Sequence, residues 1–353
     1  MKNTNGKLGV ALLGLGKYAT EQLAPALQET KYCWLAGIIT GSSQKANQFK
    51  QKYSIPGENI YNYDNFDSIK DNPAIDIVYV VTPNALHAAF AVRAAKAGKH
   101  VICEKPMATT LEDCDRMIDA CIQAGVTLSV GYRLHFEPYN QQIIQLATTH
   151  KYGYVQKVIA RDGIGEVHGW RLNKQLAGGG ALMDLGIYCV QAANYLFNMS
   201  PIAVTVQKHD NTLDEVEKEL TFQLEYPGGF MAECACSYSK KMNYLHAMAN
   251  NGWFELEPAF GYAGIKGKTS SGDMHFEPVN QQALEMDRIA QAILRDKASP
   301  VPGEMGREDI QILLAIYEAM HNGQRVILDP VIQASATTET GGSINGSSFQ
   351  VKS

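Results

Sequence analysis

Long apolar runs, clusters of basic residues and paired cysteine motifs are all missing from this sequence. The longest apolar stretches, such as VALLGL and IDIVYVV, are far shorter than the ~20 residues that a helix needs to cross a bilayer. The N-terminus, MKNTNGK, is polar and has no apolar core of the kind found in secretory signals. We therefore expect no membrane attachment and a cytoplasmic location, with a periplasmic location as the alternative if an export signal preceded this sequence.

The charge balance gives no sign of a polyanionic partner. The chain carries 31 Lys and Arg against 36 Asp and Glu, which gives a formal net charge of -5. Mild acidity without a basic run offers no electrostatic footprint for nucleic acids or anionic lipids. We therefore expect neither partner, and a small molecule becomes the natural ligand.

The seven cysteines are scattered, with no CxxC pair and no His/Cys cluster at zinc spacing. Cys234 and Cys236 lie two residues apart in a strand-like run, so their side chains share one face. Such a pair more often consists of buried small hydrophobic residues than of metal ligands. The pattern predicts a reducing compartment and no structural metal.

The length of 353 residues suggests two domains, and the pattern changes between them. In residues 1–132, near-continuous apolar runs alternate with helical patterns, such as those over 17–30 and 44–53. Strands of this kind are typical of a parallel sheet that helices cover on both faces. We therefore predict an α/β fold that begins with a Rossmann dinucleotide-binding domain.

Residues 133–330 have a different texture, with alternating strand-like segments such as AVTVQKH and LTFQLEY separated by turn signals. We predict an α+β domain for substrate binding and oligomerisation, built on an open, mostly antiparallel sheet. One helix is expected over about 180–196, and two more near 280–296 and 304–321. Residues 331–353 are rich in Ser, Thr and Gly without periodicity, and we predict a disordered tail there.

A dinucleotide fingerprint follows the first apolar run. In LGVALLGLGKYA, Gly14, Leu15 and Gly16 are followed by Ala19 at the third position of the G-x-G-x-x-G/A pattern. The first glycine permits a tight turn, the second lets a pyrophosphate approach the backbone, and the small third residue lets helix and strand pack closely. The alternative is merely a tight turn, but the strand-turn-helix context favours a nucleotide site.

The end of the second strand indicates which nucleotide binds. An acid that holds the ribose hydroxyls is usual in NAD-binding chains here, but the next acid is Glu58. Thr40, Gly41, Ser42 and Lys45 instead offer hydroxyls, a turn and a cation, which suit a 2'-phosphate. This favours NADP over NAD, although Lys45 alone could be an ordinary solvated helix residue.

Charged residues also follow the apolar run HVIC, where Glu104 and Lys105 begin the sequence EKP. Ligands bind at the carboxyl ends of strands in an open parallel sheet, so these residues are candidate site residues rather than a surface ion pair. A second candidate cluster follows three glycines, Gly178 to Gly180. Asp184 and Tyr188 lie four apart on one face of a predicted helix, with apolar flanks that favour a cleft over a surface pair.

Together these stretches resemble the glucose-fructose oxidoreductase, inositol dehydrogenase and rhizopine-catabolism (Gfo/Idh/MocA) family, most closely its glucose-fructose oxidoreductase group. The matching segments cover residues 9 to about 265 and include GLGKYA, PNALHAAFAVRAAKAGKHVICEKPMAT, GYRLHFEPYN and LAGGGALMDLGIY. The resemblance implies that Lys105, Asp184 and Tyr188 are catalytic and that Arg133, Arg171 and Tyr238 line the substrate pocket. It also implies cofactor contacts from Lys17, Tyr18, Pro83, Asn84, His87, Glu104, Lys105, Arg133, Trp170 and Arg171.

The implied reaction is NADP-dependent oxidation of an aldose such as glucose at C1 to the lactone, with a tyrosine as the base. A free phenol, with a pKa near ~10, is a poor base at neutral pH, but a neighbouring ammonium such as that of Lys105 favours the phenolate. It stays open whether a second sugar such as fructose is reduced to sorbitol by a retained cofactor, or NADPH is released. A sugar or nucleotide sensor and an NAD-dependent glycosidase are the alternatives from other classes. A sheet with one open face also predicts a homodimer or homotetramer.

Overall fold

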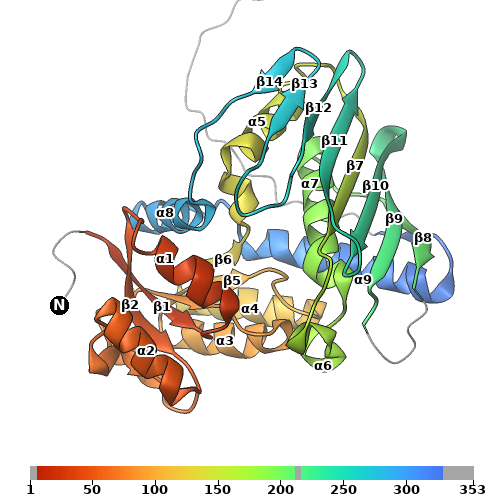
Figure 1. Cartoon of the computed structure of the whole chain (residues 1–353). Helices are drawn as coiled ribbons and strands as arrows, with labels where there is room; N and C mark the ends of the chain where they lie inside the picture. The colour runs from red at the N-terminus through yellow and green to blue at the C-terminus, as the bar shows by residue number, and fades with distance from the viewer. Residues whose placement is uncertain (1–5, 211–215, 329–353) are drawn as a thin grey trace, which may run out of the picture.

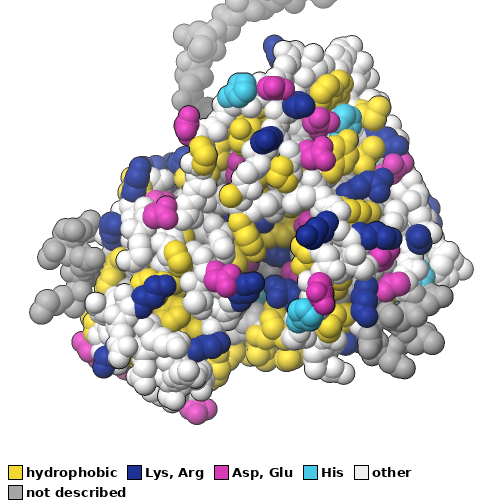
Figure 2. All heavy atoms as spheres, in the orientation of Figure 1, with side chains coloured by type: hydrophobic (Ala, Val, Ile, Leu, Met, Phe, Trp, Pro, Cys, Tyr) yellow, Lys and Arg dark blue, Asp and Glu magenta, His cyan; other side chains and the backbone are white. Residues whose placement is uncertain are grey.

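The computed structural model describes residues 6–210 and 216–328 of the chain. The predicted tail at 331–353 lies outside the described residues. Two sheets organise the molecule, one in each half of the sequence, and helices lie against both (Figure 1). On the face drawn in Figure 2, basic and acidic side chains are interspersed rather than gathered by sign.

The first half forms a six-stranded sheet in which every neighbouring pair of strands is parallel. Its order, β3-β2-β1-β4-β5-β6, is that of the dinucleotide-binding Rossmann fold and confirms the predicted domain type. The chain reverses its winding between β1 and β4, so ligands are expected at the carboxyl ends of these strands. The strands are β1 (Leu8–Leu13), β2 (Cys33–Ile39), β3 (Ile60–Tyr61), β4 (Ile77–Val80), β5 (His100–Glu104) and β6 (Leu128–Gly131).

Helices of this half follow the predicted alternation. Local signals set their ends: the side chain of Ser42 caps α2, Thr110 caps α4, and Gly125 ends α4 in the left-handed conformation. The helices are η1 (Ala19–Leu23) running into α1 (Ala24–Ala26), α2 (Ser43–Tyr53), α3 (His87–Lys96) and α4 (Leu111–Ala124), with short 3-10 turns η2 (Gly57–Asn59), η3 (Phe66–Asp71), η4 (Asn84–Leu86) and η5 (Arg133–Phe136).

The second half carries a nine-stranded sheet in the order β14-β13-β12-β11-β7-β10-β9-β8-β15. Only β7 and β10 pair in parallel among its described strands, so the expectation of a mostly antiparallel open sheet is confirmed. The strands are β7 (Val155–Gly163), β8 (Ala203–His209), β9 (Glu219–Tyr226), β10 (Phe230–Ser237), β11 (Met242–Ala249), β12 (Gly252–Leu256), β13 (Gly267–Thr269), β14 (Gly272–Met274) and β15 (Val326–Ile327).

The helix predicted over about 180–196 is a core element of the second half. It begins as a π-helical segment, η7 (Leu182–Gly186), continues as α7 (Ile187–Phe197) and packs on β7. Residues 174–197 are long and apolar enough to cross a membrane by length and composition, but 72% of the apolar window is buried inside the protein. That burial is what a core helix shows.

Two C-terminal helices connect the halves. In α8 (Gln281–Leu294), the Asp287 carboxylate accepts hydrogen bonds from the backbone N–H groups of Lys31 and Tyr32 in the first half. In α9 (Gly303–Asn322), one face packs on α4 and another on β8. The remaining helical segments are α5 (Pro138–Thr148), η6 (Gly169–Leu172), α6 (Lys174–Ala177) and η8 (Pro227–Gly229).

Candidate functional site

The glycine-rich turn after β1 has the geometry of a phosphate-binding loop. Gly14 has φ of +97°, and a Cβ there would lie 2.6 Å from the carbonyl oxygen of Val81, so only glycine fits. A Cβ on Gly16 would meet nothing within 4 Å, which leaves open space beside the backbone. Thr82 Oγ1, at the end of β4, is buried with no hydrogen-bond partner among the described residues. These features fit a bound pyrophosphate.

The residues predicted to choose NADP lie beside this turn. Lys45 Nζ donates a hydrogen bond to the carbonyl oxygen of Leu15 at 2.8 Å, so its charge stands at the edge of the glycine-rich loop. The Ser42 hydroxyl accepts from Lys45 N at 3.3 Å, and the Thr40 hydroxyl accepts from Ser42 N at 3.2 Å. Gly41 lies under the ring of Tyr63. A ribose 2'-phosphate here would meet hydroxyls and a cation.

The loop after β4 is held by buried polar contacts. Asn84 Nδ2 donates to the carbonyl oxygen of Ala177 at 2.8 Å. The His87 ring nitrogens lie 2.9 Å from the carbonyl oxygens of Pro106 and Thr82, and burial lowers the pKa of this imidazole. His87 therefore joins two strand ends, while its predicted cofactor contact, like those of Pro83 and Asn84, stays a prediction.

Two further predicted cofactor contacts follow the glycine-rich turn. Lys17 points to solvent, with its side chain 84% exposed and Nζ 3.9 Å from Glu21 Oε2. The Tyr18 ring packs 5.8 Å from that of Tyr262, and Gln282 Nε2 donates to its hydroxyl at 3.5 Å. Tyr18 therefore faces the second half of the chain, whereas Lys17 faces away from the protein.

Lys105 and Asp184 are brought together across the two halves. Lys105 Nζ donates to the backbone oxygen of Asp184 at 2.6 Å and lies 3.3 Å from its Oδ1. Burial alone would raise the pKa of Asp184, but the charges of Lys105 and Arg171 outweigh it and lower that pKa. Burial also lowers the pKa of Lys105, yet the acidic groups of Tyr188, Asp184 and Glu104 raise it overall. The result is an ammonium paired with a carboxylate at neutral pH.

Tyr188 lies between two cations. Its ring centroid is 4.3 Å from Lys105 Nζ and 5.3 Å from Arg133 Cζ. The ring also packs against Phe260, with centroids 6.1 Å apart. The phenol of Tyr188 therefore lies in the same cluster as Lys105 and Arg133, as a tyrosine that exchanges a proton with a substrate would have to.

The three predicted substrate residues are each engaged with other site elements. Arg133 is buried, and its guanidinium donates to the carbonyl oxygens of Gly261 at 3.1 Å and Phe260 at 2.7 Å, and to the side chain of Gln281. Arg171 Nε donates to Asp184 Oδ2 at 2.8 Å.

Tyr238 contacts the same aspartate, and Trp170 contacts Arg171, which is bound to it. The Tyr238 hydroxyl lies 3.1 Å from Gly180 O and 3.3 Å from Asp184 Oδ2. The guanidinium carbon of Arg171 lies over the ring of Trp170, 4.9 Å from the ring centroid. Substrate contact by Arg133, Arg171 and Tyr238, and cofactor contact by Trp170, remain predictions.

Two acidic residues that sequence reasoning missed support the site. Asp162, buried at the end of β7, faces Lys105, Asp184 and Arg133, and burial raises its pKa to about 7. Glu217 accepts hydrogen bonds from the backbone N–H groups of Gly180 at 3.0 Å and Leu182 at 2.9 Å, so it anchors the start of η7. The only local sequence signal for Asp162 was an acidic residue at a strand position that is usually buried.

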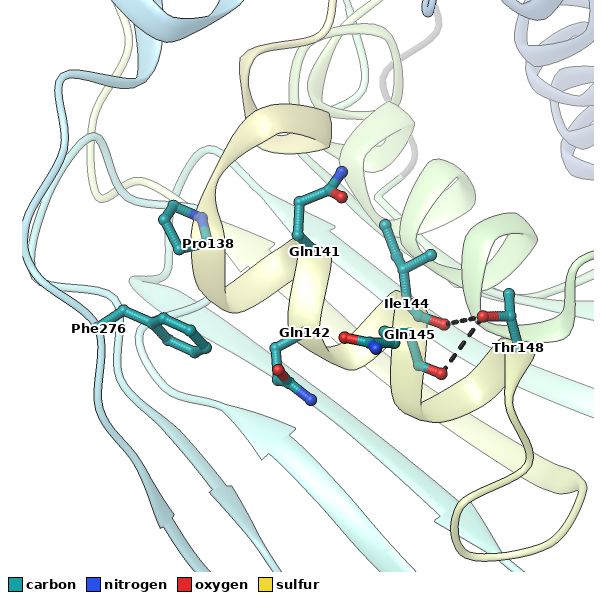
Figure 3. A pocket seen from close by; sticks show the side chains of 7 residues that line it. All are labelled: Pro138, Gln141, Gln142, Ile144, Gln145, Thr148 and Phe276. Carbon is teal, nitrogen blue, oxygen red and sulfur yellow. Dashed lines mark hydrogen bonds between the residues drawn. The ribbon is translucent and has the colours of Figure 1, made fainter.

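The catalytic candidates do not line the surface hollow of Figure 3. That hollow has a volume of about 530 Å³ and lies along α5, with the ring of Phe276 opposite the helix. Among the described residues, no group of three or more His, Cys, Asp or Glu side chains could hold a metal ion. All seven cysteines are buried, and none of them forms a disulfide.

Comparison with known proteins shows that both halves of the chain match one oxidoreductase family. Residues 8–132 match the model of an oxidoreductase family with an NAD-binding Rossmann fold (GFO_IDH_MocA), and residues 141–257 match the GFO/IDH/MocA C-terminal domain. The chain is 41% identical to aldose-aldose oxidoreductase from Caulobacter crescentus, solved with glycerol, covering 91% of this chain and 100% of that one with a TM-score of 0.88.

Two curated relatives are haloarchaeal enzymes. The chain is 29% identical to a D-xylose 1-dehydrogenase [NADP(+)] from Haloarcula marismortui, over 92% of this chain and 94% of the relative. It is 27% identical to D-xylose 1-dehydrogenase (NADP(+)) 2 from Haloferax volcanii, over 90% and 99% of the two chains. Both likenesses span the two halves of the chain rather than the nucleotide-binding domain alone.

Proposed function

The chain belongs to the GFO/IDH/MocA oxidoreductase family, and on that premise we propose that it is an NADP-dependent enzyme that oxidises an aldose at C1 to the lactone. One observation carries the proposal: Lys105 Nζ lies over the ring of Tyr188, 4.3 Å from its centroid, and Lys105 is paired with Asp184. A phenol flanked by cations at the strand ends of a Rossmann sheet is a base placed where a nicotinamide and a sugar would meet.

The cofactor assignment rests on the residues around the glycine-rich turn. Gly14 and Gly16 would let the pyrophosphate approach the backbone, while Thr40, Ser42 and Lys45 would meet the 2'-phosphate. The NADP named in both haloarchaeal relatives supports this choice over NAD. When bound, NADP supplies the hydride acceptor of the reaction.

The protein supplies the proton transfer. The C1 hydroxyl of the aldose loses its proton to the phenolate of Tyr188 while the C1 hydrogen leaves as hydride, so the C–O bond becomes the carbonyl of the lactone. Lys105, which lies over the ring of Tyr188, can hydrogen-bond to the sugar oxygen as negative charge develops on it. Asp184 fixes the ammonium of Lys105, and Arg171 and Tyr238 fix Asp184 in turn.

We also propose that a second sugar takes the hydride back while the cofactor stays bound. The likeness to aldose-aldose oxidoreductase, at 41% identity over nearly the whole chain, favours this closed cycle. The likeness to the D-xylose 1-dehydrogenases, at 29% and 27% identity, favours release of NADPH instead. Fructose, xylose and glucose are the acceptors to compare.

One experiment tests both levels of the proposal. The purified protein is denatured to release and identify any bound nucleotide, and the native protein is then mixed with glucose or xylose while absorbance of the reduced nicotinamide is followed. Reoxidation in place by a second sugar supports the closed cycle, whereas NADPH in the filtrate supports a dehydrogenase. Undiminished sugar oxidation in the double variant Lys105→Met, Tyr188→Phe would refute the assigned site.

Assembly and location are part of the same proposal. The outer face of the second sheet carries half-buried side chains of Tyr244, His246 and Trp253, with neighbouring rings 6.0 Å and 5.7 Å apart. We propose that this face pairs two copies of the chain, and light scattering of a Trp253→Glu variant tests that pairing. We propose a cytoplasmic location as well, which fractionation of cells producing the full chain would check.

A further inference from the structure

Two buried glutamates from distant parts of the chain meet at the hydroxyl of Tyr79. The Tyr79 hydroxyl lies 2.7 Å from Oε1 of Glu104, at the end of β5, and 3.2 Å from Oε2 of Glu285, on α8. Glu285 is 0% exposed, and Glu104 is 8% exposed. The proton transfer described above makes no use of Glu285, so its burial needs another explanation.

The Tyr79 hydroxyl has one hydrogen to donate but two glutamate side chains beside it. Burial, followed by the charges of Glu104 and Glu285, raises the pKa of Tyr79, so its hydroxyl keeps its single hydrogen. That hydrogen serves the shorter contact, to Glu104. Glu285 can then interact favourably with the phenol oxygen only by donating a hydrogen itself, which requires a protonated carboxyl group.

The other carboxyl oxygen of Glu285 also favours a protonated carboxyl group. Oε1 of Glu285 is buried and has no hydrogen-bond partner among the described residues. A buried carboxylate with one oxygen unpaired is far more costly than the carbonyl oxygen of a neutral acid in the same place. The geometry therefore disfavours an ionised Glu285 at both oxygens.

Charged groups of both signs surround Glu285 and Glu104. Burial and the charge of Glu104 raise the pKa of Glu285, whereas the charge of Arg133 acts in the opposite direction and is outweighed. Lys105, which directly follows β5, and Tyr18, which directly precedes η1, also face this pair, and Cys33 of β2 contacts the backbone oxygen of Met286 beside it. Tyr262 faces Tyr18 and Lys105 at the edge of the cluster.

We propose that Glu285 is a proton-carrying positioning residue. As a neutral acid it donates to Tyr79, Tyr79 donates to Glu104, and Oε2 of Glu104 accepts from the backbone N–H of Lys105 at 3.3 Å. This chain of hydrogen bonds runs from α8 to the strand end that carries the catalytic lysine. Loss of the proton places two negative charges at one phenol and loosens α8 from that strand end.

The pH dependence of the free energy of unfolding follows from the raised pKa of Glu285. A carboxyl group that stays protonated in the folded state contributes stability in full below its unfolded pKa, near 4.5, and this contribution is lost as pH rises toward the folded value. Glu285→Gln keeps a neutral donor at every pH. The variant therefore gains stability relative to the wild type as pH rises.

Three variants separate this role from simple packing. Glu285→Gln keeps the donor, Glu285→Leu removes it, and Glu318→Gln changes an exposed glutamate on α9 as the matched control. The midpoint of thermal unfolding is measured from about pH 5 to about pH 9, where a shift of several degrees is resolvable. The infrared C=O stretch of a protonated carboxylic acid is recorded for the same proteins. The pH profile of kcat/KM for aldose oxidation is the third measurement, and it alone rests on the proposed function.

A protonated Glu285 is expected to give an infrared acid band that Glu285→Gln lacks and Glu318→Gln retains. The unfolding midpoint of Glu285→Gln should fall less at alkaline pH than that of the wild type, and its kcat/KM should hold to a higher pH. The Leu variant should lose about tenfold or more in kcat/KM at all pH values. An unchanged acid band and an unchanged pH slope of unfolding in Glu285→Gln would overturn the proposal, whether or not the protein oxidises aldoses.

Discussion

Lys105 and Asp184, 79 residues apart in sequence, meet with Nζ of the lysine 2.6 Å from the backbone oxygen of the aspartate and 3.3 Å from its carboxylate. The lysine directly follows strand β5 of the Rossmann sheet, and the aspartate lies in the π-helical start of a core helix in the second half. This pair joins the two halves at the point where the phenol of Tyr188 lies. The charge of the site therefore depends on both halves being in place.

Asp184→Asn should destabilise the protein. Removing the carboxylate leaves Lys105 and Arg171 without their acid in a largely buried place, so the free energy of unfolding at neutral pH should fall by about 3 kcal/mol. Because the folded pKa of Asp184 is lowered, its stabilisation is present above the unfolded value, near 3.8, and is lost as pH falls through the folded value. Urea unfolding measures the loss, and Asp113→Asn, in an exposed pair with Arg116, is the control that should stay within about 0.5 kcal/mol.

Tyr188→Phe should abolish most of the turnover and spare the fold. The ring still packs against Phe260, but the group that accepts the sugar proton is gone, so kcat should fall by about 10² to 10⁴. Stopped-flow absorbance of nicotinamide reduction measures the effect, and fluorescence titration checks that NADP still binds. Tyr154→Phe, at an exposed tyrosine, is the matched control, and wild-type turnover in Tyr188→Phe would rule out the phenol as the base.

Asp162→Asn should change how stability depends on pH. Burial raises the folded pKa of Asp162 to about 7, so the wild type loses stability from this group as pH rises from about 4 to about 7, by about 1.4 kcal/mol for each pH unit. The amide cannot ionise, so the variant should show a shallower fall over that range. Urea unfolding at about pH 5 and about pH 8 gives the comparison, and equal slopes for the two proteins would contradict the assignment.

Gly16→Val should weaken the cofactor without weakening the fold. A Cβ at Gly16 meets no protein atom within 4 Å, and the φ of Gly16 lies outside the left-handed region, so the chain tolerates a Cβ there. The same Cβ would occupy the space where a pyrophosphate approaches the backbone, so the Kd for NADP should rise by about tenfold or more. Isothermal titration measures the Kd, and an unchanged melting temperature without nucleotide confirms the intact fold. Unaltered NADP affinity would place the phosphates elsewhere.

Several site features could be predicted from the sequence because their signals are local. The glycine spacing after the first strand dictates a tight turn, and the structure shows Gly14 at a positive φ against the end of β4. The four-residue spacing of Asp184 and Tyr188 holds across a π-helical segment, and both side chains reach Lys105. A motif of this kind reports its own backbone geometry, which neighbouring residues determine.

Other features could not be predicted because they depend on long-range packing. Arg133 donates to the carbonyl oxygens of Phe260 and Gly261, 127 and 128 residues away, and its predicted contacts with sugar and cofactor stay predictions. Lys17 follows the glycine-rich turn directly, yet its side chain faces solvent. Asp162 and Glu217 had no motif around them, and only the packed structure shows that Asp162 faces Lys105 and that Glu217 holds the backbone N–H groups of Gly180 and Leu182.

The sequence by itself determined the alternation of strands and helices, the nucleotide turn and the chemical types at the strand ends, because hydrophobic period and glycine placement act over a few residues. The tertiary structure decided which side chains meet: Lys105 with Asp184 and Tyr188, and Glu285 with Tyr79 from 206 residues away. Burial then set the charge of each group, since desolvation and neighbouring charges exist only once the two halves have packed together.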